Sequence, residues 1–213
     1  MREPQTTDLA TLAALLAERA VHGRLILAMA GAPGSGKSTT AEKLAARLNQ
    51  AQAGTAAVLP MDGYHYDDLY LGPAGLQPRK GAPQTFDVGG LFHTLRRLRA
   101  RDEPAVAVPV FDRKIEIARA GARLIPPEVP VIIVEGNYLL LQQAPWPRLA
   151  PLFDITVMID VPEAVLRSRL ALRWQKYGLT PAAITAKLEE NDLPNGRLVR
   201  SASAPADYRI AMY

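Results

Sequence analysis

Continuous apolar runs are spaced along the chain, with helix-like segments between them. The runs, each of a length typical of a strand buried on both faces, lie at residues 25–30, 56–61, 131–134 and 155–159. Segments with helical start and stop signals lie at residues 9–21, 39–48, 87–101, 162–176 and 181–190. Strands that alternate with helices predict an α/β domain, in which a mostly parallel sheet is the middle layer of a three-layer α/β/α sandwich.

The remaining segments carry weaker patterns. Residues 105–111 alternate small and branched side chains and are expected to be extended, a short segment lies near 195–199, and residues 208–212 predict a last strand. Residues 63–85 are rich in Gly, Pro and Tyr, and loops of this length in compact domains are usually functional or disordered. Because its aromatic residues argue against disorder, we expect this loop to cover a substrate within a single domain over residues 1–213.

The first apolar run leads into a glycine-rich turn that fits the phosphate-binding pattern G-x-x-x-x-G-K-[ST]. Gly34 and Gly36 lack a Cβ atom, so the backbone can turn its N–H groups inward and form a nest for phosphate. Lys37 would reach the β- and γ-phosphates of ATP, and Ser38 would bind Mg²⁺. The alternative is a turn that binds nothing. The residues expected around the nucleotide are Gly31, Ala32, Pro33, Gly34, Ser35, Gly36, Lys37, Ser38 and Thr39.

Acidic residues follow three of the predicted strands, namely Asp62, Glu135 and Asp160. Ligands of parallel sheets bind beyond the carboxyl ends of the strands, so we expect these side chains near the glycine-rich turn. Asp62 is expected to be the general base for an acceptor hydroxyl, and its alternative role is a turn-capping aspartate before Gly63. Glu135 resembles the acid that holds Mg²⁺ through water in this fold, and its alternative role is a helix-capping acid before Gly136.

Cations are predicted on the helix after the fourth apolar run. Arg169 and Arg173 are four residues apart, share one helix face, and have no acidic residue three or four positions away. Two like charges so placed repel unless an anion lies near them. We therefore expect both to bind the phosphates of ATP from a small helical lid over about 167–180, and the alternative is a solvated basic surface. Arg167, by contrast, can pair with Glu163.

Composition narrows the functional class. The chain has no cysteine, which excludes disulfides, thiolate zinc sites and thiol catalysis and is compatible with the cytoplasm. A formal net charge of +4 is modest and needs no nucleic acid to explain it. The longest apolar run, 129–141, is too short for a membrane span, and the N-terminal residues do not read as a signal peptide. We expect neither a nucleic-acid nor a membrane partner, and both a monomer and a homodimer stay open.

Six segments together resemble a known family. They read GAPGSGKST, MDGYHYDD, RKGAPQTFD, VPVFDR, VEGNYLLL and DVPEAVLRSRLALRW, in the order found in P-loop kinases of the uridine kinase, phosphoribulokinase and bacterial pantothenate kinase family. The resemblance runs from about Leu25 to Ile210. It is greatest to a subgroup often labelled fructose transport system kinase, to which NDLPNGRLV is also similar. It implies the P-loop NTPase fold and an ATP- and Mg²⁺-dependent kinase.

The resemblance also implies roles for individual residues. It implies Asp62 as the base, Glu135 as an acid near Mg²⁺, and the turn near Pro205 as a neighbour of the adenine. The residues expected on the acceptor side are Asp62, Tyr64, His65, Lys80, Phe86, Arg113 and Asn137. The chain lacks the long C-terminal portion of pantothenate kinase, and its Asp-Gly-Tyr-His differs from the Asp-Ser-Phe-Tyr of uridine kinase. The acceptor is therefore left open among a sugar, a nucleoside and a pantothenate-like molecule.

A second class of function is also compatible with the phosphate-binding turn. The chain would then be a P-loop regulatory ATPase associated with sugar transport, without a small-molecule acceptor. No Asn-Lys-x-Asp motif of GTPases and no Leu-Ser-Gly-Gly signature of transport ATPases occurs in the sequence. The acceptor-side residues favour the kinase, because an ATPase would not need a base, an aromatic loop and lid arginines together.

Overall fold

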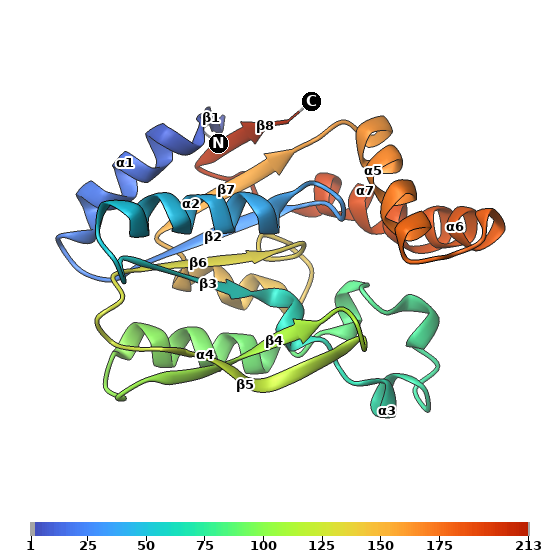
Figure 1. Cartoon of the computed structure of the whole chain (residues 1–213), viewed down its shortest axis with the longest axis horizontal. Helices are drawn as coiled ribbons and strands as arrows, with labels where there is room; N and C mark the ends of the chain where they lie inside the picture. Colours follow the sequence, from blue (N-terminus) through green and yellow to red (C-terminus); the bar gives the residue numbers. More distant parts are fainter. Residues whose placement is uncertain (1–2, 213) are drawn as a thin grey trace.

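A six-stranded sheet forms the centre of the protein (Figure 1). The computed structural model describes residues 3–212. The strands lie in the order β1-β8-β7-β2-β6-β3, and each neighbouring pair is parallel. Their bounds are Gln5–Thr6 (β1), Leu25–Gly31 (β2), Ala56–Pro60 (β3), Val131–Gly136 (β6), Ile155–Asp160 (β7) and Tyr208–Ala211 (β8). The predicted mostly parallel sheet is confirmed, and only the two-residue β1 lacks a signal in the sequence.

Helices cover both faces of this sheet and complete the predicted three-layer sandwich (Figure 1). α1 (Leu9–Ala20), α2 (Lys37–Ala51) and α5 (Glu163–Lys176) bury side chains on one face, and α4 (Val88–Ala100) does so on the other. The other helices are α3 (Asp68–Leu71), α6 (Pro181–Lys187) and α7 (Leu193–Ala202). Within residues 3–212, no helix combines the length and the apolar character needed to cross a membrane.

The apolar run of β2 contributes to both halves of the core. Ile26, Ala28 and Ala30 belong to the cluster that contains α4, whereas Leu27 and Met29 belong to the cluster that contains α1 and α2. All five side chains are fully buried. A strand points successive side chains to opposite faces. A strand covered on both faces therefore needs an unbroken apolar run, which explains why its sequence shows no alternation.

A two-stranded antiparallel hairpin lies outside the main sheet. It consists of β4 (Val106–Asp112) and β5 (Ile117–Ile125), and it runs beside α4 with its tip toward the end of the molecule that carries α3 (Figure 1). The extended segment predicted at 105–111 is confirmed by β4. β5 is not predicted, because most of its side chains are exposed and its sequence, IARAGARLI, contains no apolar run.

The loop over residues 63–85 is compact and contains short helical turns. The turns that flank α3 lie at Met61–Tyr64, Gln77–Arg79 and Pro83–Thr85. Backbone hydrogen bonds close the loop, from Tyr66 N to Thr85 O at 2.9 Å and from Asp87 N to Tyr64 O at 2.8 Å. The loop therefore forms one unit at the carboxyl edge of the sheet, where β3 ends.

The C-terminal helices differ from the prediction in their bounds. The helix predicted at 181–190 ends at Lys187, passes through a π-helical turn over Leu188–Asp192, and is followed by α7. The sequence predicts only a short segment there, because Pro194 and Gly196 are poor helix formers. Proline is tolerated in the first turn of a helix, where its missing N–H would have no helical partner.

Arg24, the residue before β2, links that strand to three other backbone segments through its side chain. Its guanidinium donates to the backbone carbonyls of Leu98 (2.5 Å), Pro126 (2.8 Å) and Val129 (2.8 Å). We expect Arg24→Ala to lower the free energy of unfolding by about 2–3 kcal/mol, because three backbone carbonyls, two of them in partly buried hydrogen bonds, lose a charged donor. Urea denaturation measures this loss. Arg47→Ala, an exposed control on α2, should stay within about 0.5 kcal/mol of the parent, and equal stability of the two variants would contradict the assignment.

Candidate active site

The predicted phosphate-binding turn joins β2 to α2. Gly36 precedes α2 with φ of +87°, and Gly34 has φ of +78°, a backbone conformation that residues with a Cβ atom rarely adopt. A Cβ atom on Gly34 would also lie 2.9 Å from the side chain of Leu170 in α5. The first N–H groups of α2, from Lys37 onward, belong to the turn, as a phosphate site at a helix N-terminus requires.

A cavity of about 250 Å³ lies between this turn and the carboxyl ends of β3 and β6. We call it the main cavity. The predicted site residues that line it are Pro33, Gly34, Gly36, Lys37, Ser38, Thr39, Asp62, His65, Lys80, Phe86, Arg113, Asn137 and Arg173. The fold therefore brings the predicted nucleotide side and the predicted acceptor side to one space. Gly31 and Ser35 do not line the main cavity, and the Ser35 side chain is fully buried.

Ser38 and Glu135 form the candidate magnesium site. Ser38 Oγ donates to Glu135 Oε2 at 3.0 Å, and Glu135 is only 4% exposed. Burial raises the pKa of Glu135 to about 7, against the opposing charge of Lys37. A hydroxyl and a carboxylate beside a phosphate-binding turn fit Mg²⁺, which prefers oxygen ligands and keeps several waters. With two protein oxygens in this pair, phosphate oxygens and water would complete the coordination of Mg²⁺. Residues 3–212 contain no group of three His, Cys, Asp or Glu suited to a metal.

The carboxylate of Asp62 lies in the main cavity and is held by Arg113. Arg113 Nη2 donates to Asp62 Oδ2. Burial raises the pKa of this carboxyl, but the charges of Arg113, His65 and Lys37 outweigh burial and hold the pKa below its ordinary value. Asp62 is therefore ionised at neutral pH, as a general base must be. Burial lowers the pKa of the Lys37 ammonium, and Glu135 and Asp62 oppose that shift.

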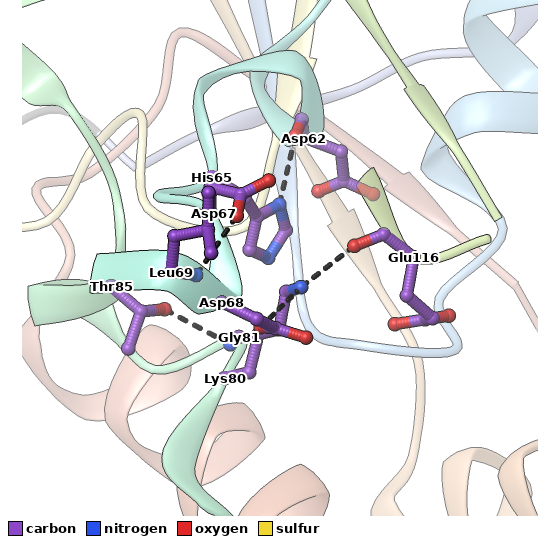
Figure 2. A network of polar contacts seen from close by, with 9 residues as sticks. All are labelled: Asp62, His65, Asp67, Asp68, Leu69, Lys80, Gly81, Thr85 and Glu116. Atoms are coloured by element: carbon purple, nitrogen blue, oxygen red, sulfur yellow. Dashed lines mark hydrogen bonds and ion pairs between the residues drawn. The ribbon is translucent and has the colours of Figure 1, made fainter. Parts of the chain in front are cut away.

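His65 connects Asp62 to an aromatic wall. Its Nδ1–H donates to the Asp62 backbone carbonyl at 2.8 Å, as the dashed line in Figure 2 shows. The ring centroid lies 4.0 Å from that of Phe86 and 4.8 Å from that of Phe111. Burial lowers the pKa of His65, so the imidazole is neutral at pH 7. Since Nδ1 carries the proton, Nε2 is available as an acceptor.

Lys80 joins the loop to the hairpin tip. Its ammonium donates to Asp68 Oδ1 at 2.8 Å and to the Glu116 carbonyl at 2.7 Å, so that it lies between α3 and the β4–β5 turn (Figure 2). Its side chain is 12% exposed, and it lies 5.6 Å from the centroid of the Phe111 ring. Lys80 lines the main cavity, as predicted for an acceptor-side residue. Its charge is already paired with the Asp68 carboxylate, so Lys80 links α3 to the β4–β5 turn in the wall of the main cavity.

Tyr64 does not reach the main cavity, contrary to the prediction. It is 7% exposed and belongs to the core cluster that includes Leu91 and Leu95 of α4. It follows Met61, which is in the same cluster, by three residues in a 3₁₀ turn, where residues at this spacing lie on one side. Asn137, in contrast, lines the main cavity, and its Oδ1 has no hydrogen-bond partner within residues 3–212. A ligand hydroxyl could satisfy this buried acceptor.

The two predicted lid arginines lie on the same helix but in different surroundings. Arg173 lines the main cavity. Arg169 Nη1 donates to the Ser35 carbonyl at 3.4 Å, and this places the guanidinium against the backbone of the phosphate-binding turn. α5 therefore presents one cation to the cavity and one to the turn itself.

The predicted pairing of Arg167 with Glu163 is wrong. Arg167 pairs with Glu189, and Glu163 accepts two hydrogen bonds from Arg197 of α7, at 2.6 and 3.0 Å. The i, i+4 spacing favours the pair within the helix. The packing of α7 against the start of α5 supplies a bidentate guanidinium that the sequence pattern cannot show.

A second cavity, also of about 250 Å³, lies on the other side of the phosphate-binding turn. Pro205 lines it, as do Ala32, Gly196 and Val199. These side chains are small or apolar, which suits a flat ring system. Ala32 belongs to the phosphate-binding turn, so the second cavity is next to the turn and on the side away from Asp62.

Several residues of the main cavity are not predicted from the sequence. They are Gln77, Gly81, Phe111, Glu116, Trp174, Lys187, Asn191, Asp192 and Asn195. Two of them are linked, since Asn195 Nδ2 donates to Asn191 Oδ1 at 3.1 Å and Asn191 Nδ2 donates to the Lys80 carbonyl at 3.0 Å. The signal that could have revealed this pair is NDLPNG, a polar stretch at a π-helical turn, where functional residues are frequent.

Comparisons with known proteins bear on the fold and the family. No family model matches the chain. The chain is 35% identical over 192 residues to the uncharacterized protein YggC of Escherichia coli K12, which covers 89% of this chain and 78% of that protein. It is 32% identical over 179 residues to a "putative uridine kinase" of Schizosaccharomyces pombe, which covers 81% of this chain and 76% of that protein.

One solved structure has the same fold over almost the whole chain. It is a "putative fructose transport system kinase" from Silicibacter sp. TM1040, with 44% identity and a TM-score of 0.87 over 95% of this chain and 98% of that chain. Together with the parallel sheet and its glycine-rich turn, these matches confirm the P-loop fold and the resemblance drawn from the sequence motifs. The chain belongs to the P-loop kinase family that contains uridine-kinase-like proteins and pantothenate kinases.

Proposed function

We propose that this protein is an ATP-dependent kinase that transfers the γ-phosphoryl group to a hydroxyl group of a small metabolite. The observation that carries the proposal is that the phosphate-binding turn and the ionised carboxylate of Asp62 line one cavity. We further propose that residues 1–213 act as one kinase domain. Its acceptor loop spans about residues 63–85, and its lid spans about residues 167–180.

The donor side binds the nucleotide. The backbone N–H groups of the phosphate-binding turn and the Lys37 ammonium bind the phosphates of ATP, and the adenine occupies the second cavity beside Pro205. Ser38, with Glu135 through water, would hold Mg²⁺. Bound Mg²⁺ would neutralise charge that develops on the phosphate oxygens. The chain itself supplies orientation and the positive charge of Lys37.

The acceptor side supplies the base. Asp62 accepts the proton of the acceptor hydroxyl while the acceptor oxygen forms a bond to the γ-phosphorus. The bond between that phosphorus and the oxygen bridging to the β-phosphate breaks at the same time, and its electron pair leaves with ADP. Arg113 holds the carboxylate, and Asn137 and His65 offer acceptors for other hydroxyls of the substrate.

A screen of ATP consumption tests this function. The panel contains uridine and other nucleosides, fructose and other ketoses, pantothenate and glycerate, with MgATP in excess. Acceptor-dependent release of ADP supports the kinase. Rapid hydrolysis that no acceptor accelerates would instead support a regulatory ATPase associated with sugar transport.

The base assignment predicts a large effect of Asp62→Asn. We expect turnover to fall about 10²–10⁴-fold, the span typical of a general base, while the affinity for MgATP stays nearly unchanged. Turnover is measured with the acceptor from the screen, and affinity by calorimetry. Asp67→Asn is the matched control, since Asp67 lies in the same loop outside the main cavity and accepts from Leu69 N at 2.9 Å (Figure 2). Unchanged turnover in Asp62→Asn would rule out the base.

The ion pair with Arg113 predicts a measurable pKa shift. The carboxyl pKa of Asp62 should lie below 3.8 in the parent protein and rise in Arg113→Met, because burial is then less opposed. Carbon-13 NMR of the carboxyl group follows the titration. In the parent, the corresponding stability is present above pH 3.8 and is lost as the pH falls through the lowered pKa. Arg119→Met is the control: it breaks the ion pair between Arg119 and Asp112 on the same hairpin and should not change the pKa of Asp62.

The lid assignment predicts a loss of rate. Arg173→Ala and Arg169→Ala should each lower kcat about 10²-fold with a small change in the KM for ATP, because the charge that they meet is greatest in the transition state. Steady-state kinetics measure both constants. Arg167→Ala, on the same helix but paired with exposed Glu189, is the control and should keep its kcat. A loss of thermal stability without a loss of kcat would favour a solvated basic surface.

A further inference from the structure

The lid side of the main cavity carries a cation that the proposed mechanism does not use. Lys187 is the last residue of α6 and lines the main cavity. Within the part of the chain that the structure describes, its ammonium forms no ion pair and no side-chain hydrogen bond. The charge of Lys187 acts on the nearby carboxyl of Asp192, but the two do not come within ion-pair distance, so the ammonium keeps its hydrogens for an anionic ligand.

Two other side chains hold this cation in place. The Lys187 ammonium lies 4.5 Å from the centroid of the Trp174 ring, within the range of a cation–π interaction. The Trp174 ring is oriented by its own N–H, which donates to Asp192 Oδ2 at 2.6 Å. Trp174 comes from α5 and Asp192 from the π-helical turn, so three elements converge to place one charge on the cavity wall.

The other cations of the main cavity differ in their partners. Arg113 pairs with Asp62, and Lys80 pairs with Asp68. Lys187 and Arg173, both on the lid side, form no ion pair within residues 3–212. Lys37, in the phosphate-binding turn, also forms no ion pair there and is already assigned to the phosphates of ATP. Lys187 therefore adds to Arg173 a second lid-side cation that can meet a ligand.

We propose that Lys187 binds an oxyanion of a ligand in the main cavity, and that Trp174 and Asp192 are positioning residues for it. The ligand group is a phosphate or a carboxylate, because these accept charge-assisted hydrogen bonds from an ammonium. It can come from the triphosphate of the nucleotide or from an anionic group of the acceptor. The inference rests on the proposed function, since it assumes that the main cavity binds phosphate esters.

Two calorimetric titrations separate these sources. The first adds Mg²⁺–AMP-PNP to the parent protein, Lys187→Met and Lys187→Arg. The second adds inorganic phosphate to the same proteins already saturated with Mg²⁺–AMP-PNP, so that the nucleotide phosphate positions are filled. We expect Lys187→Met to weaken one of the two affinities about tenfold, the effect of one charge-assisted hydrogen bond, and Lys187→Arg to restore most of it.

Matched variants test the specificity of this effect. Lys176→Met removes a charge from the exposed end of α5 outside the main cavity and should change neither affinity. Trp174→Phe keeps a ring beside Lys187 but removes the N–H, and should weaken the same affinity about two- to fourfold. Asp192→Asn removes the carboxylate charge near Lys187 but keeps an acceptor oxygen for the Trp174 N–H, so it is the reference for Asp192→Ala, which removes the acceptor as well and should bind about two- to fourfold more weakly than Asp192→Asn. Fluorescence of Trp174 should shift to the red in Asp192→Ala, because its N–H gains water, while Trp146 stays buried in the core.

The results distinguish a failure of the proposed function from a failure of the Lys187 proposal. If the parent protein does not bind Mg²⁺–AMP-PNP, the proposed function fails and this inference fails with it. If the parent binds the nucleotide and Lys187→Met matches it in both titrations, the inference alone is overturned. A loss in Lys187→Met that Lys187→Arg does not restore, or that Lys176→Met reproduces, would also overturn it.

Discussion

The site depends on the interaction of the buried Lys37 ammonium with two nearby carboxylates. A charge removed from water is costly unless opposite charges surround it. Here Glu135 and Asp62 supply them, and each stands at the carboxyl end of a strand in the main sheet. The register pairs Met29 with Glu135, and Pro60 with the same glutamate. A shift of either strand would therefore remove the compensation for Lys37, so sheet register and phosphate binding are coupled.

The acceptor side depends on a different kind of support. α3 and the hairpin tip lie outside the main sheet, and the Lys80 ammonium joins them through the Asp68 carboxylate and the Glu116 carbonyl (Figure 2). The His65 ring packs at a tilt against the rings of Phe86 and Phe111, in the same wall of the main cavity as Asp62. The donor side thus rests on the regular sheet, whereas the acceptor wall is assembled from loop segments. Under the proposed function, the reaction therefore depends on the sheet and the choice of substrate on the loop segments.

Much of the fold could be predicted because burial leaves a direct trace in the sequence. β2 and residues 131–134 of β6 are covered on both faces, so these runs are apolar throughout, and the glycine-rich turn needs backbone angles that exclude most other residues. In β7, buried positions alternate with half-buried ones that include Thr156. The sequence signals of β5 and α7 are weaker. β5 is mostly exposed, and α7 contains a proline and a glycine that obscure its helical character.

The sequence by itself determined the parallel α/β core, the phosphate-binding turn and the carboxylates at the strand ends, because strand periodicity and glycine chemistry are local properties. Only the tertiary structure decided which polar side chains share a cavity. It turned Tyr64 into the core and His65 toward the base, paired Glu163 with Arg197 across 34 positions, and brought Lys187 and Trp174 to the wall opposite Asp62. Side-chain direction in irregular turns, and contacts between distant segments, depend on packing that no local pattern encodes.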